Sequence, residues 1–185
     1  MKILSGSVKQ LLSRNPLFLD TETTGLGLAD EIVEIAIVDS DGIPLLDTLI
    51  RPTIPVPSSA TSIHGISQNH VSNAPSFDII FSELLTIVEN KILVIYNADY
   101  DIRMIRQSAK PYNLKLAFGE VWCAMHMAAE FFGDWNPSSG SYRWHKLNVA
   151  AMRCHISPPP NMHRAKADAE LTRRLVQHIA GSEGT

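Results

Sequence analysis

Leu17-Phe-Leu-Asp-Thr-Glu-Thr-Thr-Gly-Leu26 is the stretch that decides the fold of this 185-residue chain. Its apolar residues predict a buried strand over 17–22 that ends in a turn. Side chains alternate between the two faces of a strand, so Asp20 and Glu22 lie on the same face. Two neighbouring buried carboxylates repel each other unless a cation lies between them. The stretch therefore predicts a metal site, although two acids merely solvated at the end of a strand would also fit it.

Patterns outside this stretch predict an alternation of strands and helices. β-branched residues over 31–39 and 43–50, joined by the turn Asp39-Ser-Asp-Gly42, extend the first strand into a three-stranded meander. Apolar residues at helical spacing predict a helix over 77–88, with its start near Pro75. The other predicted strands are 91–96 and 121–122. The other predicted helices are 102–110, 125–132, 147–152, about 163 to 179 and a short one near 5–14, and irregular segments are expected at 51–59 and 133–140. This order is typical of an α/β fold.

The composition limits the class of protein. A hydrophobic fraction of 45% excludes a disordered or fibrous chain, and the length suits one domain. A net charge of −3 argues against coating long nucleic acid, but it is compatible with binding a short strand end. Neither a signal peptide nor a membrane-spanning run is apparent, so we expect a cytoplasmic protein without a membrane partner. Two cysteines predict free thiols in a reducing compartment.

Carboxylates occur at three places near the ends of predicted elements: Asp20 with Glu22, Asp101, and Asp168. Magnesium and manganese prefer oxygen ligands, and four carboxylates could hold two such ions. Two ions roughly 4 Å apart would stabilise both the attacking and the leaving oxygen of a phosphodiester cleavage. His163 lies five residues before Asp168, and histidine is a side chain suited to act as a general base. A surface or helix-capping histidine is the alternative interpretation.

Three ordered segments resemble the signature motifs of the DEDD superfamily of 3′-to-5′ exonucleases, in the branch with a histidine in the third motif. They are Asp20-Thr-Glu-Thr-Thr-Gly-Leu26, Asn97-Ala-Asp-Tyr-Asp101 and His163-Arg-Ala-Lys-Ala-Asp-Ala169. The proofreading epsilon subunit of bacterial DNA polymerase III and ribonuclease T are members of this branch. The likeness extends from Leu17 to about Ile179 and includes Ile63-His-Gly-Ile66.

The resemblance implies a ribonuclease H-like α/β fold with a mixed central sheet flanked by helices, in one exonuclease domain over 1–185 with an N-terminal extension of about 15 residues. It implies two divalent cations, Mg²⁺ or Mn²⁺, and release of nucleoside 5′-monophosphates. By this resemblance the metal ligands would be Asp20, Glu22, Asp101 and Asp168, and the general base would be His163. Thr23, Leu26 and His64 would bind substrate: Thr23 through its backbone, Leu26 as an apolar wedge against the terminal base, and His64 at the terminal phosphate or sugar.

The expected partner is the 3′ end of nucleic acid, with single-stranded DNA favoured. The alternatives are an exoribonuclease of the ribonuclease T or oligoribonuclease type, a non-catalytic nucleic-acid-binding domain of the same fold, and a phosphoesterase acting on small nucleotides. The resemblance is also compatible with a homodimer. No polymerase-tethering tail is apparent, so we expect a free-standing enzyme. Tyr96 and Tyr100 replace the usual histidine and phenylalanine of the second motif, and neither change removes a ligand.

Two other groups of residues remain as candidates. Cys123 with His126, and Cys154 with His155, could be zinc ligands, but their spacing matches no standard finger and we expect core or surface residues instead. Aromatic and basic residues alternate over 135–146 and could either stack on unpaired bases or pack on the core; they are Trp135, Tyr142, Arg143, Trp144, His145 and Lys146. Near the third motif, Arg164, Lys166, Arg173 and Arg174 could meet phosphates or form the solvated side of a helix.

Overall fold

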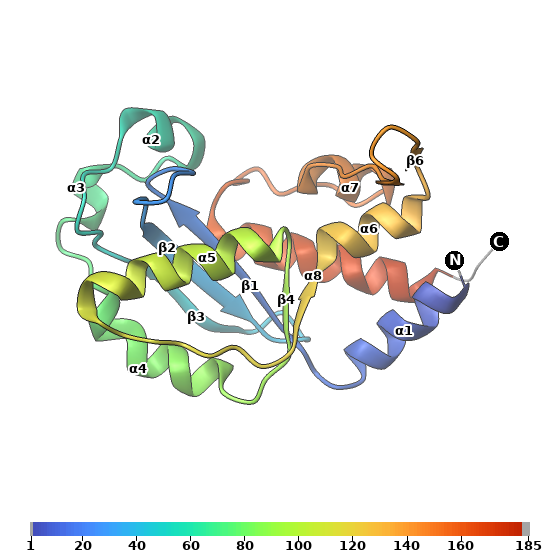
Figure 1. Cartoon of the computed structure of the whole chain (residues 1–185), viewed down its shortest axis with the longest axis horizontal. Coiled ribbons are helices and arrows are strands. Elements are labelled where there is room, and N and C mark those ends of the chain that lie inside the picture. The colour runs from blue at the N-terminus through green and yellow to red at the C-terminus, as the bar shows by residue number, and fades with distance from the viewer. Residues whose placement is uncertain (1, 183–185) are drawn as a thin grey trace.

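A five-stranded mixed sheet forms the centre of the computed structural model, which describes residues 2–182 (Figure 1). Its strand order is β3-β2-β1-β4-β5, with bounds β1 Leu17–Thr23, β2 Ile32–Val38, β3 Pro44–Leu49, β4 Leu93–Ile95 and β5 Val121–Cys123. β1, β2 and β3 form the predicted antiparallel meander, whereas β4 and β5 run parallel to β1. The carboxyl ends of the three parallel strands therefore meet at one edge of the sheet, which is where α/β folds commonly bind ligands.

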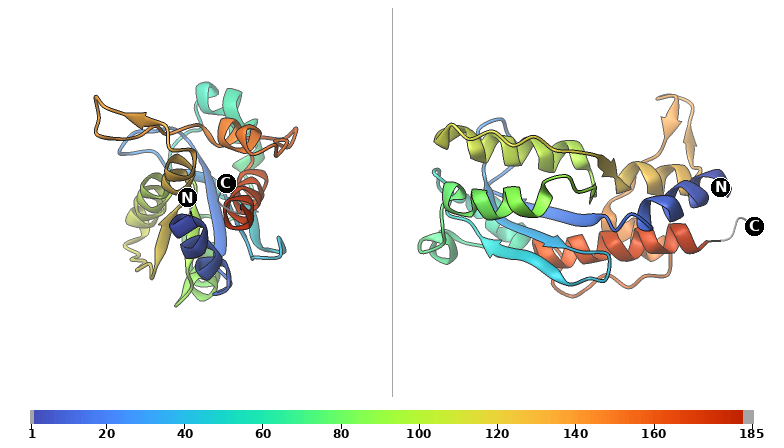
Figure 2. Two further views of the ribbon diagram at one scale, coloured as in Figure 1. Left: turned by 90° about the vertical axis from the view of Figure 1, so that its right-hand side faces the viewer. Right: turned by 90° about the horizontal axis from the view of Figure 1, so that it is seen from below.

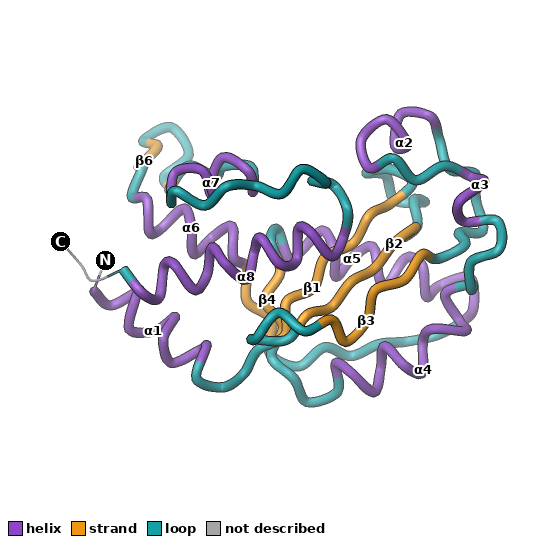
Figure 3. Tube along the Cα trace, turned by 180° about the vertical axis from the view of Figure 1, so that it is seen from behind, coloured by secondary structure: helices purple, strands orange, loops and turns teal. Residues whose placement is uncertain are grey.

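Helices cover both faces of this sheet, as the views in Figures 2 and 3 show. On one face the core contains β1 Phe18 together with side chains of α1 Lys2–Leu12, α6 Ala124–Phe132, α7 Leu147–Arg153 and α8 Ala165–Gly181. On the other face Leu17 and Leu19 pack against α4 Phe77–Val88 and α5 Ala98–Ala109. The alternation of side chains along β1 places Asp20 and Glu22 on the α8 side, like Phe18. The predicted mixed α/β fold is confirmed.

Some elements differ from their sequence-based bounds. α5 begins at Ala98 rather than near 102, so that Asp101 lies in its first turn. The short helix expected near 5–14 is α1, and its buried Val8 and Leu11 pack in the same core as α8. Tertiary contacts give this short segment the apolar partner that an isolated helix of its length would lack. Three shorter elements also lie in the chain: α2 Ser58–His64, α3 Gln68–Val71 and the 3₁₀ turn Lys110–Tyr112.

The segment predicted as a loop after α6 contains a small β-hairpin, formed by β6 Trp135–Asn136 and β7 Ser141–Tyr142. Its composition is that of a loop, but Trp135 and Asn136 pair with Tyr142 and Ser141 across the hairpin, and the Arg143 N–H donates to the Asp134 carbonyl at its base at 2.8 Å. The rings of Trp135 and Tyr142 also pack together, with centroids 5.4 Å apart. Within residues 2–182, none of the helices is both long enough and apolar enough to cross a membrane.

Candidate active site

The first part of the site is built by β1, which carries two acids toward α8. Glu22 lies opposite Glu34 of β2, and the ladder is irregular between Glu22 and Thr23. The pairing of β1 with β2 is therefore disturbed directly beside Glu22, and bulges of this kind often occur next to functional sites. Asp20 and Glu22 therefore lie together on one face, as the spacing of their side chains predicts.

Asp101 reaches the same place from the first turn of α5. Its Oδ1 accepts hydrogen bonds from the backbone N–H of Thr21, at 3.0 Å, and from the Thr21 hydroxyl, at 2.7 Å. Asp101 is buried, so these two bonds orient a carboxylate that water does not reach. Thr21, which the sequence analysis did not single out, therefore fixes the second motif to the first.

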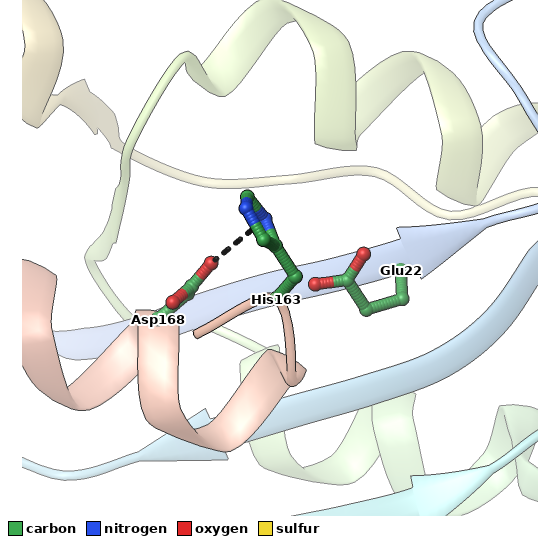
Figure 4. A group of neighbouring side chains, drawn as sticks. All are labelled: Glu22, His163 and Asp168. Atoms are coloured by element: carbon green, nitrogen blue, oxygen red, sulfur yellow. Dashed lines mark ion pairs between the residues drawn. The ribbon is translucent and has the colours of Figure 1, made fainter. Parts of the chain in front are cut away.

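The third motif completes the cluster at the start of α8 (Figure 4). Glu22, His163 and Asp168 each present a ligand atom within 4.8 Å of the other two. The Nδ1 atom of His163 lies 4.0 Å from Oδ2 of Asp168, and the His163 side chain is 55% exposed. His163 precedes the helix in a left-handed conformation with φ 62°. Few non-glycine residues adopt this conformation, and such backbone outliers cluster at functional sites.

The electrostatics of the four acids reflect their proximity. Burial raises the pKa of Asp20 well above its ordinary value, and the charges of Asp101, Asp168 and Glu22 raise it further. Burial also raises the pKa of Glu22 to about 8, with additional repulsion from Asp168. The pKa of Asp101 rises to about 7 through burial, although its hydrogen bonds to Thr21 oppose the shift. A cation bound among these groups would favour their charged forms.

The same residues fit a divalent cation on two further grounds. Asp168 is buried, and burial raises the pKa of its carboxyl to about 6 despite the opposing effect of His163. Its Oδ1 is buried and has no hydrogen-bond partner within the described part of the chain. An orphaned buried carboxylate oxygen is costly unless a ligand binds it. All four acids offer oxygen donors, which Mg²⁺ and Mn²⁺ prefer.

Glu34 is a residue of the site that the sequence analysis missed. It is buried in β2 and receives hydrogen bonds from Nε of Arg164, at 3.0 Å, and from the backbone N–H of Ala165, at 2.8 Å. The Arg164 guanidinium also forms an ion pair with Glu34 at 2.5 Å. A single acid within the otherwise apolar segment Ile32–Val38 was the available signal. Because buried acids are nearly always paired, this acid is the kind of residue for which a cationic partner can be expected, but the sequence does not indicate which one.

A first hollow, of about 500 Å³, opens beside Glu22 and is lined by the three predicted substrate-binding residues, Thr23, Leu26 and His64. Leu26 is 80% exposed at its rim, whereas His64 is buried. The Nδ1 atom of His64 accepts the Ile66 N–H at 3.0 Å, so its Nε2 carries the proton and donates to the Thr23 carbonyl at 3.2 Å. Both ring nitrogens of His64 are thus engaged within the chain. The substrate contacts of these residues remain predictions.

Tyr100 supports the wall of this first hollow. Its hydroxyl donates to the Gly25 carbonyl at 2.9 Å and lies 2.6 Å from the Thr23 hydroxyl. The turn after β1 is therefore tied to α5. A phenylalanine, usual at this position in the family that the motifs resemble, would lack both contacts.

The cysteine–histidine pairs do not form a metal site among residues 2–182. Cys154 is buried, Cys123 is half-buried, and both belong to the cores on the two faces of the sheet. The only group of three candidate ligands found in that part of the chain is Glu22 with His163 and Asp168. Arg164 is paired with Glu34, and Lys166 forms an ion pair with Asp47 at 2.7 Å.

Comparison with known proteins agrees with this geometry. The RNase_T family model, described as an exonuclease, matches residues 17–176. The chain therefore belongs to this exonuclease family, and the predictions of an enzyme and of the DEDD-type exonuclease resemblance are confirmed.

Relatives with similar sequences carry exonuclease names. The chain is 40% identical over 183 residues to a protein named uncharacterized exonuclease CP81 of Escherichia phage 186, covering 96% of this chain and 94% of the relative. It is 32% identical over 177 residues to a PolC-type DNA polymerase III of Caldanaerobacter subterraneus subsp. tengcongensis, covering 94% of this chain. The match spans only 12% of that polymerase.

Solved structures share the fold. Exonuclease X, in complex with 5′ overhanging duplex DNA, has a TM-score of 0.66 and 28% identity over 91% of this chain and 93% of its own. The nuclease domain of 3′hExo, described as a DEDDh family member bound to rAMP, has a TM-score of 0.67 over 89% of this chain and 90% of its own. Its identity of 16% supports the fold alone.

Proposed function

We propose that this chain is a divalent-metal-dependent 3′-to-5′ exonuclease that removes nucleoside 5′-monophosphates from single-stranded DNA ends. The observation that carries the proposal is the convergence of Asp20, Glu22, Asp101 and Asp168 from three distant segments beside the imidazole of His163. Placing four mutually repelling acids together, with Asp101 and Asp168 buried and Asp20 and Glu22 half-buried, costs stability, which a function that needs cations would explain.

Each residue then has a defined task. Two bound Mg²⁺ or Mn²⁺ ions would supply Lewis-acid stabilisation of the attacked phosphate and a more acidic water. Asp20, Glu22, Asp101 and Asp168 would hold the ions, with Asp101 kept in orientation by Thr21. His163 would accept the proton of the attacking water at a ring nitrogen, because its exposed side chain can approach substrate while remaining next to Asp168.

The first hollow would receive the terminal nucleoside. Its rim residue Leu26 offers an exposed apolar side chain against which the flat face of an unpaired terminal base can pack. This supports single-stranded ends as substrate. The 28% identity to Exonuclease X, a protein solved with DNA, supports DNA over RNA.

The test is cleavage of 5′-labelled single- and double-stranded DNA and RNA, with Mg²⁺ or Mn²⁺ and with chelator. We expect single-stranded DNA to shorten stepwise from its 3′ end only with metal. Asp20→Asn should abolish cleavage. Asp99→Asn should not, because Asp99 is exposed in the same helical turn as Asp101 and lies outside the cluster. Full activity of Asp20→Asn, or activity in chelator, would contradict the proposal.

A further inference from the structure

A second hollow, of about 530 Å³, lies on the other side of the acids from the first. Asn97 lines both hollows, Glu22 borders the first, and His163 and Asp168 border the second. The cluster of Glu22, His163 and Asp168 therefore lies between them. The far wall of the second hollow contains Trp144 and Lys146, which follow the β6–β7 hairpin.

Trp144 is a large aromatic side chain that lines the second hollow. It is 63% exposed, although its ring lies 5.8 Å from that of His126, at a tilt of 39°. His126 supports the indole and leaves most of its surface open to solvent. Lys146, two residues further on, is exposed at the same wall and makes this part of the hollow basic. An exposed indole beside an ammonium group suits a base and its adjoining phosphate.

The wall formed by Trp144 and Lys146 is held in place by contacts of neighbouring residues. The Tyr96 hydroxyl donates to the carbonyl of His145 at 2.7 Å, which ties the segment to the end of β4. The His145 ring contacts Asp134 at 3.0 Å, and Asp134 also pairs with Arg153 of α7. On the other side of Trp144, the backbone N–H of Arg143 donates to the Asp134 carbonyl at 2.8 Å, so the chain is fixed on both sides of Trp144. A preformed aromatic surface binds with a smaller loss of conformational entropy than a mobile one.

We propose that the second hollow binds the nucleotide on the 5′ side of the scissile phosphate, with its base stacked on Trp144 and its backbone phosphate beside Lys146. This inference rests on the proposed exonuclease function. The phosphate that is cut joins two nucleosides, and the acids have a hollow on each side. When the first hollow contains the terminal nucleoside, the strand leading to it passes through the second. A single strand of at least two nucleotides is then the minimal good substrate.

The test combines a protein change with a substrate change. Trp144→Ala is compared with wild type on a single strand that carries all its bases and on the same strand with an abasic penultimate position. We expect Trp144→Ala to raise KM about tenfold on the complete strand, because one base–aromatic stack is lost. The two proteins should have equal KM on the abasic strand, and kcat at saturation should stay unchanged.

Trp135→Ala is the matched control, because Trp135 is an exposed tryptophan of the same hairpin that does not line the hollow. It should leave KM unchanged, and thermal melting should confirm that both variants fold. An equal rise in KM for both variants, an unchanged KM for Trp144→Ala, or the same rise on the abasic strand would overturn the inference.

The inference can fail separately from the proposed function. If wild type does not shorten the complete strand, the exonuclease proposal fails, whereas normal cleavage with an indifferent Trp144→Ala variant rejects only the stacking. The same four combinations, measured as binding by fluorescence anisotropy in chelator, test stacking without any cleavage. Equal affinities of wild type and Trp144→Ala for the complete strand would again reject the inference.

Discussion

Glu34 of β2 holds Arg164, the residue that immediately follows His163. The carboxylate receives the guanidinium and the backbone N–H of Ala165, so a buried acid of the sheet fixes the first residues of α8. Because Arg164 directly follows His163, this attachment fixes the backbone next to the imidazole that Figure 4 shows beside Asp168. Arg164 also lowers the pKa of Glu22, in opposition to the neighbouring acids.

Glu34→Gln should therefore impair the enzyme through the position of His163. We expect kcat to fall about tenfold to a hundredfold with little change in KM, because a displacement of about 1 Å at a reacting group has effects of this size. Thermal melting should show destabilisation of about 1–3 kcal/mol from the weakened charged hydrogen bonds. Asp47→Asn is the control, since it removes only the exposed ion pair with Lys166 of α8. Unchanged kcat in Glu34→Gln would show that Glu34 stabilises α8 without positioning His163.

His163→Ala should lose about a hundredfold or more in kcat, as expected for removal of a general base. Metal binding should persist, because the four acids remain, and Mn²⁺ titration by calorimetry measures this separately. His155→Ala is a matched control: His155 is also exposed and also has a positive φ, of 57°, but lies outside the cluster. Equal activities of His163→Ala and His155→Ala would show that His163 is not the general base.

The stability of the metal-free protein should fall as pH rises. The pKa values of Asp168, Asp101 and Glu22 are raised to about 6, about 7 and about 8, above those of the unfolded chain. The folded state therefore binds more protons than the unfolded chain. The resulting contribution to the free energy of unfolding is fully present below about pH 4 and is lost as pH rises toward about 8. Melting in chelator between pH 5 and pH 8.5 measures this decrease. Mn²⁺ should reduce it, and Asp20→Asn should melt higher than wild type in chelator at pH 8, because one repelling charge is absent. A melting temperature independent of pH in chelator would contradict the electrostatic account.

Tyr100→Phe should loosen the wall of the first hollow without affecting the acids. Loss of the hydroxyl removes its hydrogen bond to Gly25, which we expect to cost about 1 kcal/mol, or a decrease of about 2–4 °C in Tm. KM for a single strand should rise modestly while kcat stays unchanged. Tyr112→Phe provides a comparison, because Tyr112 lies outside both hollows. A fall in kcat without a change in KM would contradict this prediction and would indicate that Tyr100 positions the acids instead of the substrate.

Local chemistry was sufficient to predict the meander, the principal helices and the shared face of Asp20 and Glu22. Asp20 and Glu22 share a face because strand side chains alternate, and this holds in any tertiary context. Asp101 and Asp168 could be associated with them because their motifs are ordered along the chain in the pattern of a known family. By contrast, no local pattern predicts that Arg164, next to His163, is bound by Glu34, which lies 130 residues away in the sequence.

The sequence by itself determined which residue types meet at the edge of the sheet, because strand periodicity and the motifs are local properties. Only the tertiary structure decided how they are held: Thr21 on Asp101, Glu34 on Arg164, and Tyr100 on the turn after β1. It also decided that residues 135–142 form a hairpin, next to which Trp144 lines a second hollow. Such contacts join residues far apart in the chain, and a hydrogen bond requires a distance and an angle that residue order alone does not specify.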